Sequence, residues 1–359
     1  MHTPEAAPHL EIVTFGGGTG GAAMVELSRL MPDIHVTMGV STGDGGNCTN
    51  DLRKLFGGPA VGDLRKVLGH ASTNAAGPLF HTRFAHDDSV STIERLNDDF
   101  LDAIVAGGSE EVRMAENAAQ LAVCIGRIAA HYQPYQLEGH TYGNFILTAL
   151  RLNNGDDLAS AVRVANGWLQ TSATVMPVAV DSHNLVMYDK ARETIIYGEG
   201  AIDKYILTEP TQMQVWLETG ETANYIESDS QKVRAILERA CYVPKPKATD
   251  EIRAAAAAAT YAIIGPGSPI TSLHPAVQPE GIDKSLSEQA VHGGLLLAVA
   301  NSDIETTTPG FACTEYLQSL EAVLGRPFDH VVSMGGSASR CRTVARVAAM
   351  IQLLRPVTL

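Results

Sequence analysis

The sequence predicts an α/β protein with a Rossmann-like core of three layers, in which helices cover both faces of a mostly parallel sheet. Three segments near the start of the chain support this prediction. Leu10–Phe15 is a short apolar run that stops at glycines, as a buried parallel strand does. Ala22–Leu30 has the apolar spacing of a helix, and Ile34–Val40 is a second apolar run. A strand, a helix and a strand within about 30 residues form a βαβ unit, which builds parallel sheets.

The same order of strand, loop and helix returns after residue 260. Tyr261–Ile264, Gly294–Ala300 and Asp329–Val332 are predicted strands, and Ala312–Leu324 is a predicted helix. We therefore expect one sheet that is built from both ends of the chain, within a single domain over residues 10–352.

Two insertions are expected between these ends. Apolar residues recur with helical spacing through residues 91–170, which predicts a helical insertion. Residues 181–245 are expected to form a small β-rich insertion, in which Leu185–Tyr188 and Thr194–Tyr197 are the clearest strands.

The charge balance narrows the classes of ligand. The chain has 26 basic and 40 acidic residues, which gives a formal net charge of −14. Proteins that bind nucleic acid usually carry a basic patch, so nucleic acid is not expected as a partner. An anionic ligand would then be held mainly by backbone N–H groups, helix N-termini or a metal ion.

The cysteines and the apolar runs indicate a cytoplasmic protein. No CxxC pair occurs, which argues against a zinc site and a disulfide framework and favours reduced thiols. Met1–Glu11 lacks the basic start and apolar centre of a signal peptide, and no run of apolar residues is long enough to predict a membrane span. The oligomeric state is not fixed by the sequence, and a homodimer is one arrangement left open.

The first predicted strand leads into a loop rich in glycine, Gly16–Gly21. Backbone N–H groups of such a loop can face an anion, and the helix that follows adds the positive end of its dipole. Gly16, Gly18 and Gly21 match the GxGxxG spacing of nucleotide-binding loops, and a tight structural turn is the alternative. No acidic residue follows the second strand where dinucleotide-binding proteins hold a ribose, so NAD is not expected.

Two further loops carry polar residues between glycines. Asp44 follows the second strand and therefore lies at the same edge of the sheet as the first loop. Its carboxylate could hold Mg²⁺, contact a sugar or a base, or act as a base, and a plain Asp-Gly turn is the alternative. His140 and Asn144 belong to a glycine loop that opens a helix, where ligand contact is expected more than catalysis by the histidine.

A fourth loop, Gly265–Ser272, follows a predicted strand and carries hydroxyl groups. Its N–H and O–H donors could surround a second phosphate or a carboxylate. Donor loops from opposite ends of the chain suit a diphosphate or a two-part ligand in a cleft. A serine hydrolase is disfavoured because the sequence has no GxSxG motif.

In this order, the loops resemble those of the CofD/YvcK superfamily, also called the gluconeogenesis-factor or 2-phospholactate-transferase-like family. The resemblance covers about residues 10–335 and is closer to the YvcK branch. The matching segments are Gly16–Gly20, Asp44–Gly46, Gly62–Arg65, Gly139–Asn144, Gly265–Ser268 with Thr271 and Ser272, and Pro309–Gly310.

The resemblance implies a Rossmann-like fold that binds a nucleotide diphosphate or a UDP-sugar. It links the YvcK branch to cell shape and to growth on gluconeogenic carbon. The CofD branch instead transfers a phospholactyl-type group from a guanylyl donor to a deazaflavin alcohol, with Mg²⁺. This sequence has Gly43 where the YvcK branch has a second aspartate, and Arg53 corresponds to the final arginine of that motif.

Two functions follow from these residues and this resemblance. The first is a regulatory protein of the YvcK type that binds a nucleotide diphosphate or a nucleotide sugar. The second is a Mg²⁺-dependent phospho-group transferase, in which Asp44 is the catalytic and metal-binding residue; a dinucleotide oxidoreductase is a weaker third. The expected ligand-binding residues are Gly16, Gly17, Gly18, Thr19, Gly20, Asp44, Gly45, Gly46, Arg53, Asp63, His140, Asn144, Gly265, Gly267, Ser268, Thr271 and Ser272.

Overall fold

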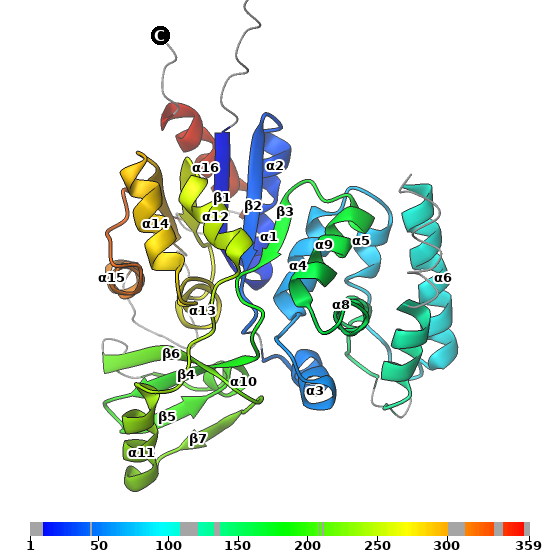
Figure 1. Cartoon of the computed structure of the whole chain (residues 1–359), viewed down its shortest axis with the longest axis horizontal. Helices are drawn as coiled ribbons and strands as arrows, with labels where there is room; N and C mark the ends of the chain where they lie inside the picture. The colour runs from blue at the N-terminus through cyan, green and yellow to red at the C-terminus, as the bar shows by residue number, and fades with distance from the viewer. Residues whose placement is uncertain are drawn as a thin grey trace, which may run out of the picture.

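A parallel sheet of six strands forms the centre of the molecule, in the order β10-β9-β8-β1-β2-β3 (Figure 1). The computed structural model describes residues 10–43, 45–107, 121–132, 137–207, 209, 212–300, 313–333 and 340–354. The expected three-layer α/β fold, with one sheet built from both ends of the chain, is confirmed. The strands are β1 Leu10–Gly16, β2 Ile34–Val40, β3 Thr174–Pro177, β8 Tyr261–Ile264, β9 Leu295–Ala300 and β10 His330–Ser333.

Both faces of this sheet are buried, because successive side chains of each strand enter two different cores. Ile12 and Ile263 belong to one hydrophobic cluster, and their neighbours Val13 and Ile264 belong to the other. Most residues of the central strands β1, β2, β8 and β9 are therefore buried on both faces and do not alternate between buried and exposed, as expected for a covered parallel sheet. The helices α1 Gly18–Met24, α2 Glu26–Leu30, α4 Gly62–Ala71 and α16 Arg340–Leu354 contribute to the first cluster, and α12 Asp250–Ala258, α13 His274–Val277, α14 Ile282–Val291 and α15 Cys313–Leu324 to the second.

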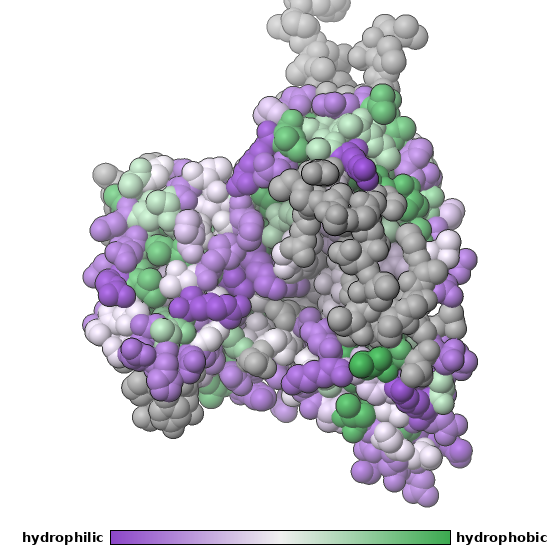
Figure 2. Space-filling model, turned by 180° about the vertical axis from the view of Figure 1, so that it is seen from behind, coloured by the Kyte–Doolittle hydropathy of each residue, from purple (hydrophilic) through white to green (hydrophobic). Residues whose placement is uncertain are grey.

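A helical lobe stands at the β3 side of the sheet and comprises α5 Ala76–Leu79, α6 Val90–Ala106, α8 Tyr142–Asn153 and α9 Leu158–Leu169. Phe100 is fully buried there, and its ring meets those of Phe80, Tyr142 and Trp168. Seen from behind, hydrophilic residues follow the junction between this lobe and the rest of the molecule (Figure 2).

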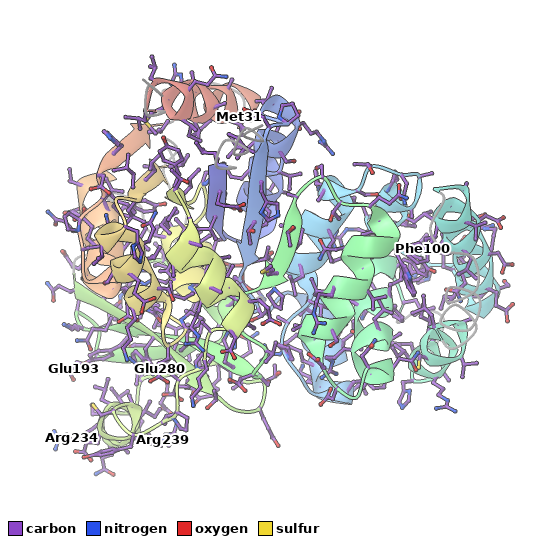
Figure 3. All side chains as sticks on the ribbon, turned by 45° about the horizontal axis from the view of Figure 1, so that its top comes forward. Met31, Phe100, Glu193, Arg234, Arg239 and Glu280 are labelled. Carbon is purple, nitrogen blue, oxygen red and sulfur yellow. The ribbon has the colours of Figure 1, made fainter. Side chains whose placement is uncertain are left out.

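A second, antiparallel sheet has the strand order β6-β4-β5-β7 and lies below the parallel sheet in Figure 1. The predicted strands Leu185–Tyr188 and Thr194–Tyr197 are confirmed within it. Helix α11 packs at its outer end, where Arg234 and Arg239 lie far from the parallel sheet (Figure 3). The elements are β4 His183–Asp189, β5 Thr194–Tyr197, α10 Glu199–Ile202, β6 Met213–Thr219, β7 Tyr225–Glu227 and α11 Ser230–Ala240.

The parallel sheet reverses its direction of growth between β1 and β8. The chain passes from β1 to its neighbour β2 on one side and from β8 to its neighbour β9 on the other. The loops after β1 and β8 therefore lead to helices on opposite faces of the sheet at its carboxyl edge, and such switch points are where open α/β sheets bind ligands. No helix in the described ranges is both long enough and apolar enough to span a bilayer.

Candidate functional site

The first glycine loop closes tightly on the start of α4. Gly18 begins α1 with a φ of 53°, and a Cβ there would lie 3.1 Å from Asp63 Oδ1 and 3.5 Å from Lys66 Nζ. A Cβ at Gly17 would collide with the carboxylate of Asp63. Only glycine allows this approach, which places the buried Asp63 and the ammonium of Lys66 beside the loop. Thr19 is exposed at the tip.

The fourth loop meets the first as expected, because a Cβ at Gly20 would collide with the carbonyl oxygen of Pro266. Its hydroxyls are engaged inside the loop: Ser268 Oγ accepts from Thr271 N at 3.4 Å and caps the π-helical turn Pro269–Leu273. Thr271 is buried and Ser272 is half-buried. The two loops are thus brought together, while the binding of a ligand by Gly265, Gly267 and Ser272 stays a prediction.

The loop that contains Asp44 is anchored to the small sheet, although Asp44 itself lies outside the described residues. Next to it, the N–H of Gly45 donates to the carboxylate of Glu199 at the start of α10. Arg53 donates to the carbonyl oxygen of His183 at 2.7 Å and to Ser182 Oγ at 3.2 Å. The guanidinium of Arg53 therefore joins helix α3, Asn47–Phe56, to strand β4, and its contact with a ligand stays a prediction.

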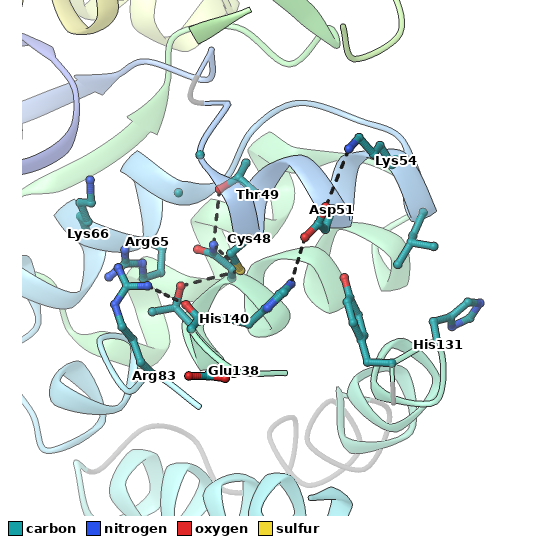
Figure 4. A pocket seen from close by; sticks show the side chains of 17 residues that line it. Cys48, Thr49, Asp51, Lys54, Arg65, Lys66, Arg83, His131, Glu138 and His140 are labelled. Atoms are coloured by element: carbon teal, nitrogen blue, oxygen red, sulfur yellow. Dashed lines mark hydrogen bonds and ion pairs between the residues drawn. The ribbon is translucent and has the colours of Figure 1, made fainter. Parts of the chain in front are cut away.

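A pocket of about 970 Å³ opens between the N-terminal halves of α3, α4 and α8 (Figure 4). Pockets of this size hold small molecules and cofactors. It continues from the glycine loop, since Lys66 lines the pocket and also lies beside Gly18. Its lining residues are Gly46, Cys48, Thr49, Asp51, Lys54, Leu55, Gly62, Arg65, Lys66, Arg83, His131, Tyr132, Glu138, Gly139, His140, Thr141 and Asn144.

Basic side chains outnumber acidic ones around this pocket. Lys54, Arg65, Lys66 and Arg83 line it together with two carboxylates, those of Asp51 and Glu138. Figure 4 shows Arg65, Lys66 and Arg83 on one side, which we call the cationic side. A local excess of positive charge in a chain of net charge −14 creates a potential that attracts anions.

Hydrogen bonds hold the two arginines in place. Arg83 Nη1 donates to the carbonyl oxygen of Gly139 at 2.7 Å, and Arg65 Nη1 lies 3.1 Å from His81 Nδ1. Burial, with smaller effects from His70 and Arg65, lowers the pKa of His81 to about 4. The imidazole is therefore neutral at pH 7, and its Nδ1 can accept a hydrogen bond from Arg65, which keeps its charge.

His140 lies on the opposite side of the pocket from Lys66 (Figure 4). It is buried, with its ring edge-on to those of Tyr132 and Phe145, and its Nε2 is 3.7 Å from Asp51 Oδ2. Burial lowers the pKa of His140, against the opposing effects of the Glu138 backbone and Asp51. The ring is thus neutral at pH 7, with one donor and one acceptor nitrogen.

Asn144 and Cys48 also line the pocket and contact each other. Asn144 Nδ2 donates to Cys48 Sγ at 3.2 Å and to Thr49 Oγ1 at 3.4 Å, which fixes the start of α3 against α8. Burial raises the pKa of the Cys48 thiol. A nucleophilic cysteine needs a lowered pKa, so this thiol is a polar lining group and not a nucleophile.

The structure brings four predicted residues to this pocket: Gly46, His140 and Asn144 line it, and Asp63 lies beneath Lys66 at 3.6 Å. Sequence reasoning missed the side chains that carry its charge and its aromatic wall, namely Arg65, Lys66, Arg83 and Tyr132. Asp63 and Lys66 stand three residues apart, a spacing that pairs opposite charges on one face of a helix, and this spacing was a usable signal. The distant Arg83 and Tyr132 gave none.

No three His, Cys, Asp or Glu side chains of the described residues are grouped so that they could bind a metal ion. The carboxylate next to the glycine loop, Asp63, is paired with Lys66. A Mg²⁺ ion held by one or two carboxylates and by phosphates of the ligand needs no such group, so the expected Mg²⁺ and its expected ligand Asp44 stay predictions.

The fold and the pocket define an α/β protein with a pocket lined by basic side chains beside the first glycine loop of a parallel sheet. The chain belongs to the family described as 2-phospho-L-lactate transferase CofD, whose model matches residues 12–349.

Relatives of this chain include two proteins named gluconeogenesis factor. The one from Halalkalibacterium halodurans is 22% identical over 313 residues, which are 86% of this chain and 72% of that protein. The one from Listeria monocytogenes is 24% identical over 268 residues, or 74% and 59%. A relative from Aquifex aeolicus is 26% identical over 279 residues, and this chain spans 60% of its length.

Solved structures support the fold. A crystal structure of a Bacillus halodurans protein, described elsewhere as a member of the UPF0052 family, has a TM-score of 0.63 and 21% identity to this chain. The match covers 92% of this chain and 82% of that one.

Proposed function

We propose that this protein binds a nucleotide diphosphate or a nucleotide sugar and acts as a regulatory protein of the gluconeogenesis-factor type. The observation that carries the proposal is the cationic side of the pocket, which adjoins a glycine loop at the switch point of the sheet. Arg65, Lys66 and Arg83 surround one opening, although the chain as a whole has a net negative charge. We infer that an anion binds there, because such a local excess of positive charge attracts anions. The names of the relatives support the regulatory role.

In this proposal the diphosphate lies between the glycine loop and the cationic side. The ammonium of Lys66 belongs to the cationic side and also lies beside Gly18 of the glycine loop. Thr19, which follows Gly18, adds an exposed hydroxyl. The two arginines add planar, fixed donors, which suit phosphate oxygens. Reduced thiols are consistent with action in the cytoplasm, where we expect the protein to influence cell shape and growth on gluconeogenic carbon.

A phospho-group transferase is the second candidate, favoured by the description of the family itself. The same cations would then stabilise negative charge on the transferred phosphate while a hydroxyl of the acceptor forms a new P–O bond and the P–O bond to the guanylyl group breaks, so that guanosine monophosphate leaves. Neutral His140, with Asp51 3.7 Å away, could receive the proton of that hydroxyl.

One binding screen separates these functions. UDP-N-acetylglucosamine, UDP, GDP and NAD are added to the full chain, with and without Mg²⁺, and the thermal unfolding temperature is recorded. A ligand at 100 times its Kd should stabilise the fold by about 2.7 kcal/mol. Stabilisation by UDP-N-acetylglucosamine without turnover supports the regulatory function. Stabilisation by GDP only with Mg²⁺ supports the transferase when product also forms in a separate assay that supplies both the phospholactyl-guanylyl donor and a deazaflavin alcohol. No response to any nucleotide refutes both functions.

A further inference from the structure

We propose that the side of the pocket around Asp51, Tyr132, His140 and Asn144 binds a neutral, hydroxyl-bearing ring of the ligand, namely the sugar of a nucleotide sugar. We call these four residues the sugar side. The inference rests on the proposed function, because it assigns the diphosphate to the cationic side. Beyond the proposed function, it states which part of the ligand the sugar side binds and which atoms make the contacts.

Asn144 supplies the first argument. Its side chain is 98% buried, since the residue is 2% exposed, and it lines the pocket. Both of its short contacts use Nδ2, whereas Oδ1 accepts no hydrogen bond from any described residue. A buried acceptor without a partner costs free energy, so a ligand that brings a donor to Oδ1 gains that free energy on binding. A phosphate bears no such donor at neutral pH, but a hydroxyl group does.

Tyr132 and His140 supply the second argument. The Tyr132 hydroxyl oxygen is buried and makes no hydrogen bond with any described residue. The ring nitrogens of His140 are also buried, and they lie near the backbone of Leu137 and Glu138 and 3.7 Å from Asp51 without a hydrogen bond of good geometry to any described residue. If these side chains served only the stability of the fold, phenylalanine would be the more stable choice, because it fills similar space without desolvating a polar group. These atoms offer both donors and acceptors, which match the two roles of a sugar hydroxyl.

Charge supplies the third argument and excludes a second phosphate on this side. The Asp51 carboxylate lies 3.7 Å from His140 Nε2, and burial keeps the pKa of this histidine low and its ring neutral. Lys54, also on this side of Figure 4, is paired with the same carboxylate at 3.9 Å. An anion would therefore meet a paired cation and unpaired acceptors, whereas a polyhydroxylated ring can donate to Asp51 and Asn144 while its apolar face lies against Tyr132.

A nucleobase also carries donors and acceptors, and the choice of ligands distinguishes it from a sugar. UDP contains the base and the diphosphate, and UDP-N-acetylglucosamine adds only the sugar. A residue that contacts the sugar changes the affinity for UDP-N-acetylglucosamine alone, whereas a residue that contacts the base changes the affinity for both.

The test is calorimetric titration of the full chain and two variants with these two nucleotides. Tyr132→Phe removes one hydroxyl without a partner in the described structure, and Asp51→Asn changes a side chain that is 45% exposed, so neither variant removes core packing. We expect each variant to lose about tenfold in affinity for UDP-N-acetylglucosamine, the upper range for one hydrogen bond, and to keep its affinity for UDP within about twofold. The matched control is Tyr242→Phe, which removes a hydroxyl from a tyrosine that is 86% exposed and outside the pocket.

Three results would overturn the inference: unchanged affinity of both variants for UDP-N-acetylglucosamine, equal losses for both nucleotides, or an equal loss in the Tyr242→Phe control. A thermal unfolding temperature of Tyr132→Phe that equals or exceeds that of the wild type shows that any loss of affinity is not a loss of folding. The proposed function fails separately, when Lys66→Met leaves the affinity for UDP unchanged.

Discussion

Replacement of Lys66 by methionine tests the role of the cationic side most cleanly. Lys66 Nζ is 3.6 Å from Asp63 Oδ1, with 34% of the lysine side chain and 7% of the aspartate side chain exposed. Methionine keeps much of the apolar stem and removes the charge. The variant therefore removes one positive charge from the pocket. Lys66 then no longer offsets the negative charge of Asp63, which repels phosphate more strongly.

Two magnitudes follow. Breaking a fully buried ion pair costs about 3–5 kcal/mol and an exposed one about 0–1 kcal/mol. Because Lys66 is one-third exposed, we expect a loss of about 1–2 kcal/mol in the free energy of unfolding. A hydrogen bond to a charged group contributes about 1.5–3 kcal/mol, so the affinity for UDP should fall by about 10-fold to 150-fold.

Lys54→Met is the matched control. Lys54 also lies three residues after an aspartate, 3.9 Å from Asp51 Oδ1, and also lines the pocket. Its side chain is 60% exposed and it lies away from the glycine loop, so stability should change by less than about 0.5 kcal/mol and UDP affinity by less than about threefold. Urea unfolding and calorimetry at low and high salt measure both quantities. Equal losses of UDP affinity in the two variants would refute the assignment of the diphosphate to Lys66.

Three further changes test the fold around the site. Burial lowers the pKa of His183 and of His274 to about 4, so the unfolded chain binds more protons than the folded one between pH 6.5 and 4. The free energy of unfolding, measured with urea, should therefore fall by about 3 kcal/mol for each histidine as pH falls through this window. A constant free energy of unfolding over that range would contradict neutral buried rings. Arg151→Met should destabilise by about 3 kcal/mol or more, because the buried guanidinium donates to the carbonyl oxygens of Phe56 and Gly57 at the end of α3; a change below about 1 kcal/mol in urea unfolding would contradict this. Gly20→Ala should force apart the loops after β1 and β8, lowering stability by about 1–3 kcal/mol and weakening UDP binding, and wild-type values for both would show that the loops are not in contact.

Much of the fold could be predicted because its strands are buried on both faces. The mostly apolar runs Ile34–Val40 and Tyr261–Ile264 agree with β2 and β8 to the residue. Helix α11 and strand β7 escaped prediction because they bury little: only Val233 of α11 is buried, and no residue of β7 is. Such elements form by packing on a sheet already present, which local periodicity does not reveal.

The site was predicted where its backbone needs glycine and missed where its side chains come from elsewhere in the chain. Two loops were predicted from their glycines, Gly16–Gly20 and Gly265–Ser268, and these loops meet at the switch point. Arg83 contributes from a segment outside the helices and strands, which is held by an isolated β-bridge to Thr141 and by the hydrogen bond of Arg83 to the carbonyl oxygen of Gly139, 56 residues later. The tertiary structure was therefore needed to identify the side chains that line the pocket, whereas the two glycine loops beside it could be predicted from the sequence.

Hydrogen–deuterium exchange of the full chain, with and without UDP-N-acetylglucosamine, tests the central claim most directly, because it shows both whether a nucleotide sugar binds and where. Slower exchange is predicted for the amides of the first glycine loop and for the N-terminal turns of α3, α4 and α8, which border the pocket. Unchanged exchange at a saturating concentration, or slower exchange confined to other parts of the molecule, would contradict the claim.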